Sequence, residues 1–382
     1  MISFCHRLHR SIVKDAVDRR KVEEKLRKLS SDRLKRRLAP LAAPVPGGAL
    51  AIELSTVSKD GTFDAWVDIQ FDGGPANQSA PMIVDSGNTV LVVPRWEDIQ
   101  GLSGYTLLGQ VKYGPFNSVD VNVVEGPILI PTQGGGVLRI PNCIFYACTC
   151  DPRVSNFGVG CVTPWSAGSS NALLAGAPTL QSPLSYLSAY PCVEFLYQAG
   201  GLFGNIPEPV VSGASLLNLY PVVPDGYTMM GIFPNYGWMS VAATSLGISG
   251  ATTAWPGAAP TAIAMVDTGG GPVFVTDPNN LLANGGWAPA ATCPSWMDSS
   301  TACQCIAADL EIELADPNGG TTFFYAIKPG TLPASAQGLT AIMCEENVFL
   351  RSQYGMNIGG LSLLFASVVI DYASNRVGFK LR

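Results

Sequence analysis

Met82 to Val93 reads MIVDSGNTVLVV, and Ala264 to Val275 reads AMVDTGGGPVFV. Each stretch has an apolar run, then Asp, a hydroxyl residue, Gly, two small residues and a second apolar run, and the two aspartates lie 182 positions apart. A second pair of apolar segments that lead into Gly, LLAGAP (173–178) and NIGGLS (357–362), aligns at an offset of 183 positions. Two segment pairs that share nearly one offset predict a chain with two related halves.

The Asp-hydroxyl-Gly motif places a carboxyl group at the end of a buried strand, and Gly permits a tight turn close to that carboxylate. One such motif is typical of an Asp in a hairpin turn. Two related copies allow Asp85 and Asp267 to meet face to face. Two carboxyl groups in contact share a proton, because both cannot ionise at low cost. One can then act as a base and the other as an acid on a bound water.

The composition favours a mainly β protein with more than one core. The chain of 382 residues exceeds the length of one compact core, and 41 Gly and 29 Pro punctuate its short apolar runs. AWVDIQF (65–71) alternates with period two before turn residues at 72–75, which predicts one strand of a hairpin. We expect a basic segment and linker over 1–50 and two lobes over 51–200 and 201–382. The sequence has no run of about 18 apolar residues, so we expect no membrane contact.

Both histidines, His6 and His9, lie at the start of the chain. Nucleophilic Ser and Cys sites need an imidazole base, and zinc hydrolases usually need His ligands. Carboxylates are therefore the best acid–base groups that the rest of the chain offers to a hydrolase.

Charge is divided unevenly along the chain. Residues 1–40 hold 13 of the 23 Lys and Arg but 5 of the 29 Asp and Glu. Apolar spacing predicts helices over 10–38, and APLAAPVPGGAL (39–50) is typical of a linker. A basic arm on an acidic body predicts that the two parts attract each other. Nucleic-acid binding is the alternative for such an arm, but the body offers no basic or aromatic platform to extend it.

Ten cysteines, nine of them after residue 40, favour a secreted or endolysosomal protein. Because nine is odd, at least one of these nine is unpaired or pairs with another chain. No secretory signal peptide is visible in the first 30 residues, which conflicts with that interpretation. A thiolate metal site, disulfides and buried thiols are all open for the group formed by Cys143, Cys148, Cys150 and Cys161. Their irregular spacing disfavours the metal site.

From Ala51 to the C-terminus the sequence resembles the pepsin-like aspartic peptidases. The resemblance is carried by Asp85-Ser86-Gly87 and Asp267-Thr268-Gly269, by YGWMSVAATSLGISG (236–250) before the second motif, and by the closing IGGLSLLFASVVIDYASNRVGF (358–379). Leu174-Ala175-Gly176 and Asn357-Ile358-Gly359 match the strands that thread beside the two catalytic turns in that family.

The resemblance implies a bilobal, mostly β fold whose lobes flank a cleft for an extended polypeptide. It implies that Asp85 and Asp267 form the catalytic dyad of an aspartic endopeptidase, without cofactor or metal. Ser86 and Thr268 would cross-link the two turns, with Gly87 and Gly269 supporting the dyad.

The same resemblance implies further features of a monomeric zymogen. The basic arm would be an activation prosegment, and Cys344 would form a disulfide with Cys303 or Cys305. Tyr113 is the first candidate for the tyrosine of a substrate-covering flap and Tyr105 the second, while a partly buried strand tyrosine is an equal alternative for Tyr113.

Three positions depart from the family pattern. Asn88 and Gly270 stand where hydroxyl residues usually donate to the outer oxygens of the dyad, and Val92 stands near the place of a flap-supporting Trp. The Asn88 amide could substitute as a donor, but Gly270 cannot. Losing a donor favours the protonated carboxyl, so we expect activity at higher pH than in a typical acid peptidase.

These departures keep a second function open, a catalytically impaired binding or inhibitor protein with the same fold. The presence of both aspartates favours the enzyme. A metal site built on the two carboxylates is a weaker third interpretation, because further ligands are missing nearby.

Overall fold

The computed structural model describes residues 49–59, 62–75, 79–113, 119–151, 155–161, 180–197, 215–233, 239–248, 251–254, 262–269, 272–276, 303–306, 308–328, 330, 341–344 and 355–382. In this part of the chain the protein is mainly β, as the sequence predicts, and its helical elements are the short 3-10 helices η1 (Trp96–Asp98), η3 (Pro183–Tyr186) and η7 (Gly360–Leu364). No helix among these residues is long and apolar enough to cross a membrane. Residues 1–48 of the basic segment and linker predicted over 1–50 lie outside the described residues, and Leu50 is the first residue of strand β1 (Leu50–Glu53).

The first motif belongs to an eight-stranded sheet. In spatial order its strands are β2 (Ser55–Lys59), β3 (Thr62–Phe71), β4 (Ala80–Asp85), β9 (Asn156–Gly158), β5 (Leu91–Val93), β8 (Val137–Cys148), β7 (Val119–Pro131) and β6 (Thr106–Tyr113). The alternating run at 65–71 lies within β3, which forms the expected hairpin with β4. Strand β4, APMIVD, is buried along almost its whole length, so it is apolar on both faces instead of alternating.

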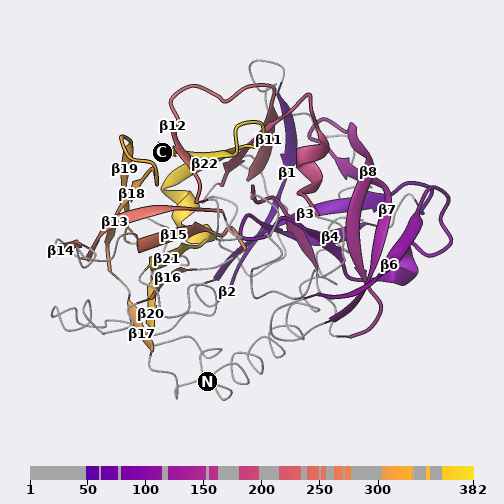
Figure 1. Ribbon diagram of the computed structural model, residues 1–382, viewed down its shortest axis with the longest axis horizontal. Coiled ribbons are helices and arrows are strands. Elements are labelled where there is room, and N and C mark those ends of the chain that lie inside the picture. Colours follow the sequence, from indigo (N-terminus) through magenta and orange to yellow (C-terminus); the bar gives the residue numbers. More distant parts are fainter. Residues whose placement is uncertain are drawn as a thin grey trace.

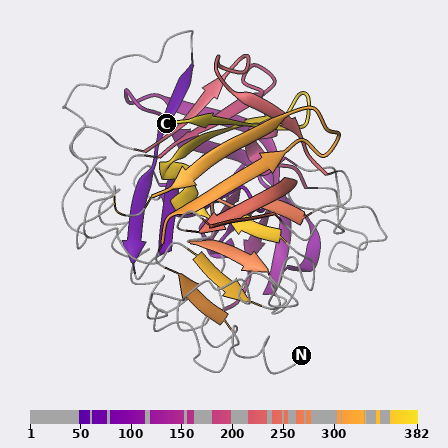
Figure 2. The same cartoon turned by 90° about the vertical axis from the view of Figure 1, so that its left-hand side faces the viewer.

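The second motif belongs to a nine-stranded sheet. Its strands are, in order, β17 (Cys303–Ile306), β20 (Ala341–Cys344), β16 (Val273–Thr276), β21 (Gly355–Ile358), β15 (Ala262–Val266), β13 (Ser240–Ile248), β18 (Leu310–Ala315) and β19 (Thr322–Ile327), with β14 (Ala251–Ala254) paired to β13. Strand β15, AIAMV, is buried throughout like β4. Figure 2 turns this sheet toward the viewer, with its orange and salmon strands in front.

The two sheets share one internal topology. The path β3-β4-β9-β5-β8 corresponds strand for strand to β13-β15-β21-β16-β20. In each path the second and third strands are parallel, the third and fourth antiparallel, and the fourth and fifth parallel. Residues 82–93 and 264–275 thus supply equivalent strands, β4 with β5 and β15 with β16, which is the relation that the repeated motif predicts.

A six-stranded sheet takes strands from both parts of the sequence. It runs β1 (Leu50–Glu53), β11 (Leu216–Tyr220), β10 (Cys192–Leu196), β22 (Ala366–Asp371), β23 (Arg376–Leu381) and β12 (Thr228–Gly231). In Figure 1, strands β6 to β8 lie at one end of the molecule and β13, β14, β18 and β19 at the other, with β1, β11 and β22 between them.

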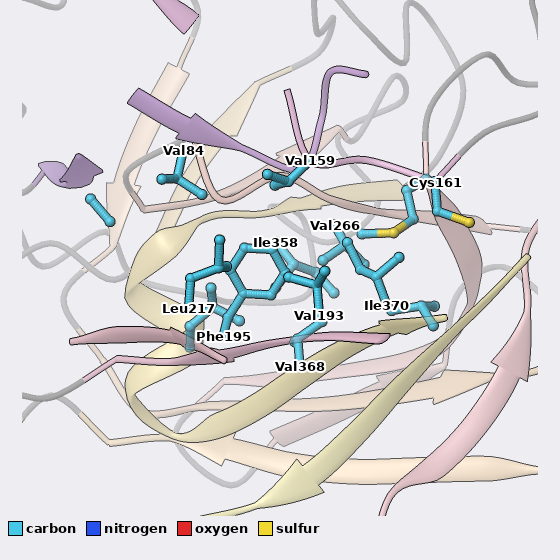
Figure 3. Packing of buried hydrophobic residues seen from close by; sticks show 14 of the residues in the cluster. Val84, Val159, Cys161, Val193, Phe195, Leu217, Val266, Ile358, Val368 and Ile370 are labelled. Carbon is cyan, nitrogen blue, oxygen red and sulfur yellow. The ribbon is translucent and has the colours of Figure 1, made fainter. Parts of the chain in front are cut away.

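One continuous core lies beneath the two motifs. Val84 of β4 and Val266 of β15 belong to the same buried cluster as Phe195 of β10 and Val368 of β22. Figure 3 shows these side chains packed between the strands that carry the aspartates and the six-stranded sheet. Because interiors are packed at crystal-like density, this core holds the ends of β4 and β15 rigidly.

Candidate active site

Each aspartate is held at the end of a buried strand by its own turn. Asp85 is the last residue of β4, and Asp267 follows β15 directly. The Gly87 backbone N–H donates to Asp85 Oδ1 at 2.8 Å, and the Gly269 N–H donates to Asp267 Oδ1 at 3.0 Å. The two Asp-hydroxyl-Gly motifs therefore fold into equivalent turns.

The two turns are joined by four buried hydrogen bonds. The Ser86 hydroxyl donates to the Val266 carbonyl at 2.9 Å and accepts from the Thr268 N–H at 3.0 Å. Reciprocally, the Thr268 hydroxyl donates to the Val84 carbonyl at 2.9 Å and accepts from the Ser86 N–H at 2.9 Å. The structure thus gives both hydroxyls the cross-linking contacts that the resemblance implied, although they are 182 residues apart.

This junction brings the two carboxyl groups into contact. A Cβ built on Gly87 would lie 2.8 Å from Asp267 Cγ, and one built on Gly269 would lie 2.8 Å from Asp85 Cγ. Only a residue without a side chain fits between the turns. The expectation that Asp85 and Asp267 meet face to face is therefore met by the geometry.

Burial raises the pKa of the Asp85 carboxyl well above its usual range. The charge of Asp267 and the hydrogen bond shared with its side chain raise it further, while the amide of Asn156 and the Gly87 N–H oppose the shift. The physical cause is that two adjacent carboxylates in a poorly solvated place cannot both be charged. Such a pair holds one proton at pH values where an isolated Asp would have lost it.

Two asparagines that sequence reasoning did not assign complete the site. Asn156 Nδ2 donates to Asp85 Oδ2 at 2.6 Å, and Asn357 Nδ2 donates to Asp267 Oδ2 at 2.7 Å. A usable signal was present in the sequence, because NFG (156–158) and NIG (357–359) share an Asn-apolar-Gly pattern.

The predicted strand beside the first turn has to be corrected. Strand β9, Asn156–Gly158, pairs in parallel with β4, as β21 pairs with β15. The equivalent of Asn357-Ile358-Gly359 is thus the segment at 156–158, whereas Leu174-Ala175-Gly176 lies outside the described residues. The sequence did not point to β9, because a three-residue strand carries too little periodicity to be recognised.

The Asn88 side chain does not take the role considered for it. Its Nδ2 donates to the Tyr113 hydroxyl, and its Oδ1 accepts from the Val90 N–H at 3.0 Å. The Oδ2 atom of Asp85 instead accepts a hydrogen bond from the Asn156 amide. Gly270 lies outside the described residues.

Of the two candidate tyrosines, Tyr113 is the one near the dyad. Burial raises its pKa, the Asn88 amide lowers it, and the charge of Asp85 raises it. Its ring packs on Tyr146 with centroids 5.5 Å apart, on β8 directly beside Val92. Tyr146 thus supports the Tyr113 ring beside Val92, the position where the resemblance implied a Trp.

Tyr105 has a different environment. Its hydroxyl accepts from the Asp72 N–H at 2.7 Å and donates to the Pro127 carbonyl at 2.5 Å. Its ring packs edge-on against Phe71 and Phe145. This tyrosine ties a turn to the body of the sheet and lies away from the dyad.

Five of the described cysteines form no disulfide, namely Cys143, Cys148, Cys150, Cys161 and Cys192. Of the three interpretations open for the first four, disulfides among themselves are thus excluded. The described residues contain no group of His, Cys, Asp or Glu that could hold a metal ion. Cys303 lies opposite Cys344 in the register of β17 and β20. Cys305 is disulfide-bonded, and which cysteine pairs with it stays a prediction.

No family model matches the chain, and no curated protein matches it.

Proposed function

We propose that the protein is an aspartic-type endopeptidase with a bilobal, pepsin-like fold, in which Asp85 and Asp267 activate one water molecule. The observation that carries this proposal is the contact between two carboxyl groups on equivalent turns, cross-linked through Ser86 and Thr268. The shared topology of the two large sheets supports the bilobal fold.

The dyad can hydrolyse an amide without a covalent intermediate. Asp85 is the better candidate for the protonated member, because its surroundings favour the neutral form. Asp267 then takes a proton from a water held between the carboxyl groups as the water oxygen attacks the peptide carbonyl carbon. Asp85 gives its proton to the carbonyl oxygen, which leaves a tetrahedral diol. As the C–N bond breaks, Asp267 gives its proton to the leaving amine nitrogen, and one diol hydroxyl returns a proton to Asp85, so the carboxylic acid product leaves the dyad in its starting state.

The opposite net charges of the basic arm over 1–50 and of the rest of the chain suggest a role for the arm. An arm of net charge near +8 would lie over a body of net charge near −14 and block an extended substrate near neutral pH. Acid protonates carboxylates and weakens that attraction. We propose that the arm is an activation prosegment, with residues 51–200 and 201–382 as the two lobes of a monomeric enzyme.

The function is tested by incubating the purified chain with a denatured protein across a range of pH, with and without pepstatin, an inhibitor of aspartic peptidases. We expect cleavage in acid that pepstatin abolishes, and slower cleavage at neutral pH before the linker is cut than after. Pepstatin binding without any cleavage would instead favour the impaired binding protein. Cleavage that pepstatin leaves unchanged would contradict the assigned dyad.

Replacing Tyr113 and Tyr105 one at a time distinguishes a tyrosine that contacts substrate from one that stabilises the fold. We expect Tyr113→Phe to lower kcat/KM on a peptide substrate about ten-fold, a cost of about 1.4 kcal/mol, because Asn88 loses its partner beside the dyad. Tyr105→Phe should instead lower the free energy of unfolding by about 1–3 kcal/mol, since Asp72 N–H and the Pro127 carbonyl lose their partner. Peptide kinetics and urea unfolding of both variants measure these effects, and the reverse pattern would exclude Tyr113 as the flap residue.

A further inference from the structure

Asn156 and Asn357 occupy equivalent places in the two sheets. On the parallel side, Asn156 pairs with Ile83 and Asn357 with Met265, in each case two residues before the aspartate. On the antiparallel side, Asn156 pairs with Val92 and Asn357 with Phe274, in each case seven residues after it. The two amides therefore reach their carboxyl groups by the same backbone route, which makes their matching contacts a property of the fold.

Each amide donates a hydrogen bond to the Oδ2 atom of one carboxyl group, in the same arrangement in both halves. In both halves the Gly N–H of the turn binds Oδ1 and the Asn amide binds Oδ2. The carbonyl oxygens of both asparagines are buried and accept no hydrogen bond. The contact with the carboxyl group is thus the side-chain hydrogen bond that orients each amide.

We propose that Asn156 and Asn357 are a matched pair of positioning residues that each hold the Oδ2 atom of one dyad carboxyl group and so replace the hydroxyl donors missing at Asn88 and Gly270. This inference rests on the proposed function. A neutral amide suits the role, because it binds a carboxylate without the positive charge that would keep the carboxylate from carrying a proton.

The amides also oppose the effect of burial on the dyad. A donor to Oδ2 stabilises the ionised carboxyl group, and Asn156 lowers the pKa of Asp85 in this way. The higher working pH expected from the missing hydroxyls is therefore offset by donors from β9 and β21. Removing either amide should move both titration steps of the pair to higher pH, because the two carboxyl groups titrate together.

The test replaces each asparagine by leucine, which has a similar shape and no donor. We expect Asn156→Leu and Asn357→Leu each to shift both limbs of the pH–rate profile upward by about one pH unit, the size of one hydrogen bond to a charged group. The same upward shift is expected in a titration of the labelled Asp carboxyl carbons followed by NMR. Because that titration needs no turnover, it decides the inference even for a chain that proves inactive, while the activity of the unaltered chain tests the function separately.

Asn218→Leu is the matched control. Asn218 is buried, donates from Nδ2 to Glu194 at 2.8 Å and has an unpartnered carbonyl oxygen, but it lies in the six-stranded sheet. The Asn218→Leu variant should be less stable than the unaltered chain, but the pH values at which Asp85 and Asp267 titrate together should not change. If Asn156→Leu does not fold, Asn156→Asp keeps the shape, replaces the donor by a third carboxyl group, and should shift the titration further upward. Folded Asn156 and Asn357 variants that titrate like Asn218→Leu would overturn the proposal.

Discussion

Asparagine in place of Asp85 should lower kcat/KM for a peptide substrate at least about a thousand-fold, and Asp267→Asn should do the same. An amide has nearly the shape of the carboxyl group, but it neither takes a proton from water nor shares one with its partner. Since the two groups act as a unit, the double variant should be little worse than either single one. Initial rates near the pH optimum measure the loss.

Two controls distinguish a loss of chemistry from a failure to fold. Asp72→Asn, at an exposed carboxylate paired with Arg139, should leave the rate unchanged. Both dyad variants should also unfold cooperatively in urea. Full activity in either Asp85→Asn or Asp267→Asn would exclude the dyad.

The pH dependence of stability gives the dyad variants a second signature. A group whose pKa is raised by folding binds its proton more tightly in the folded state, so its stabilisation is complete below the unfolded pKa of about 3.8 and is lost as pH rises through the raised folded pKa. Asn does not titrate, so the Asp85→Asn variant does not lose this stability as pH rises. The variant should therefore gain stability relative to the unaltered chain as pH rises from acid toward neutral.

The second large effect concerns the junction between the turns. Thr268→Val should lower the free energy of unfolding by about 3–5 kcal/mol, because the buried Ser86 N–H and Val84 carbonyl both lose their partner. That is a large part of the roughly 5–15 kcal/mol by which most domains are stable. Activity should fall with it, since displacement of one turn by about 1 Å separates the carboxyl groups. Urea unfolding and peptide kinetics measure the two losses.

Thr276→Val is the matched control for this substitution. Thr276 lies on β16 of the same sheet, is fully buried, and its hydroxyl has no hydrogen-bond partner. Replacing that hydroxyl by a methyl group should be neutral or slightly stabilising. If Thr268→Val and Thr276→Val lower the free energy of unfolding by the same amount, the cross-link through Thr268 contributes no more to stability than ordinary packing.

The sequence predicted the parts of the site that are encoded locally. An apolar run followed by Asp, a hydroxyl residue and Gly specifies a buried strand, its end and a tight turn within about six residues, and both copies fold that way. Composition and turn residues predicted the mainly β class because they, too, are local features of the sequence. The lack of His after residue 9 by itself narrowed the acid–base chemistry to carboxyl groups.

Tertiary structure decided which distant side chains reach the dyad. Asn156 is 71 residues from Asp85, and Asn357 is 90 residues from Asp267. Their contacts depend on β9 and β21 pairing beside β4 and β15, and strands of three or four residues leave no periodicity to reveal that pairing. The partner of Asn88 and the separate roles of Tyr113 and Tyr105 depend on the same long-range packing. Local pattern thus determined where the two carboxyl groups are presented, whereas strand pairing across the chain determined what surrounds them, because hydrogen-bond partners are chosen by proximity in space and not in sequence.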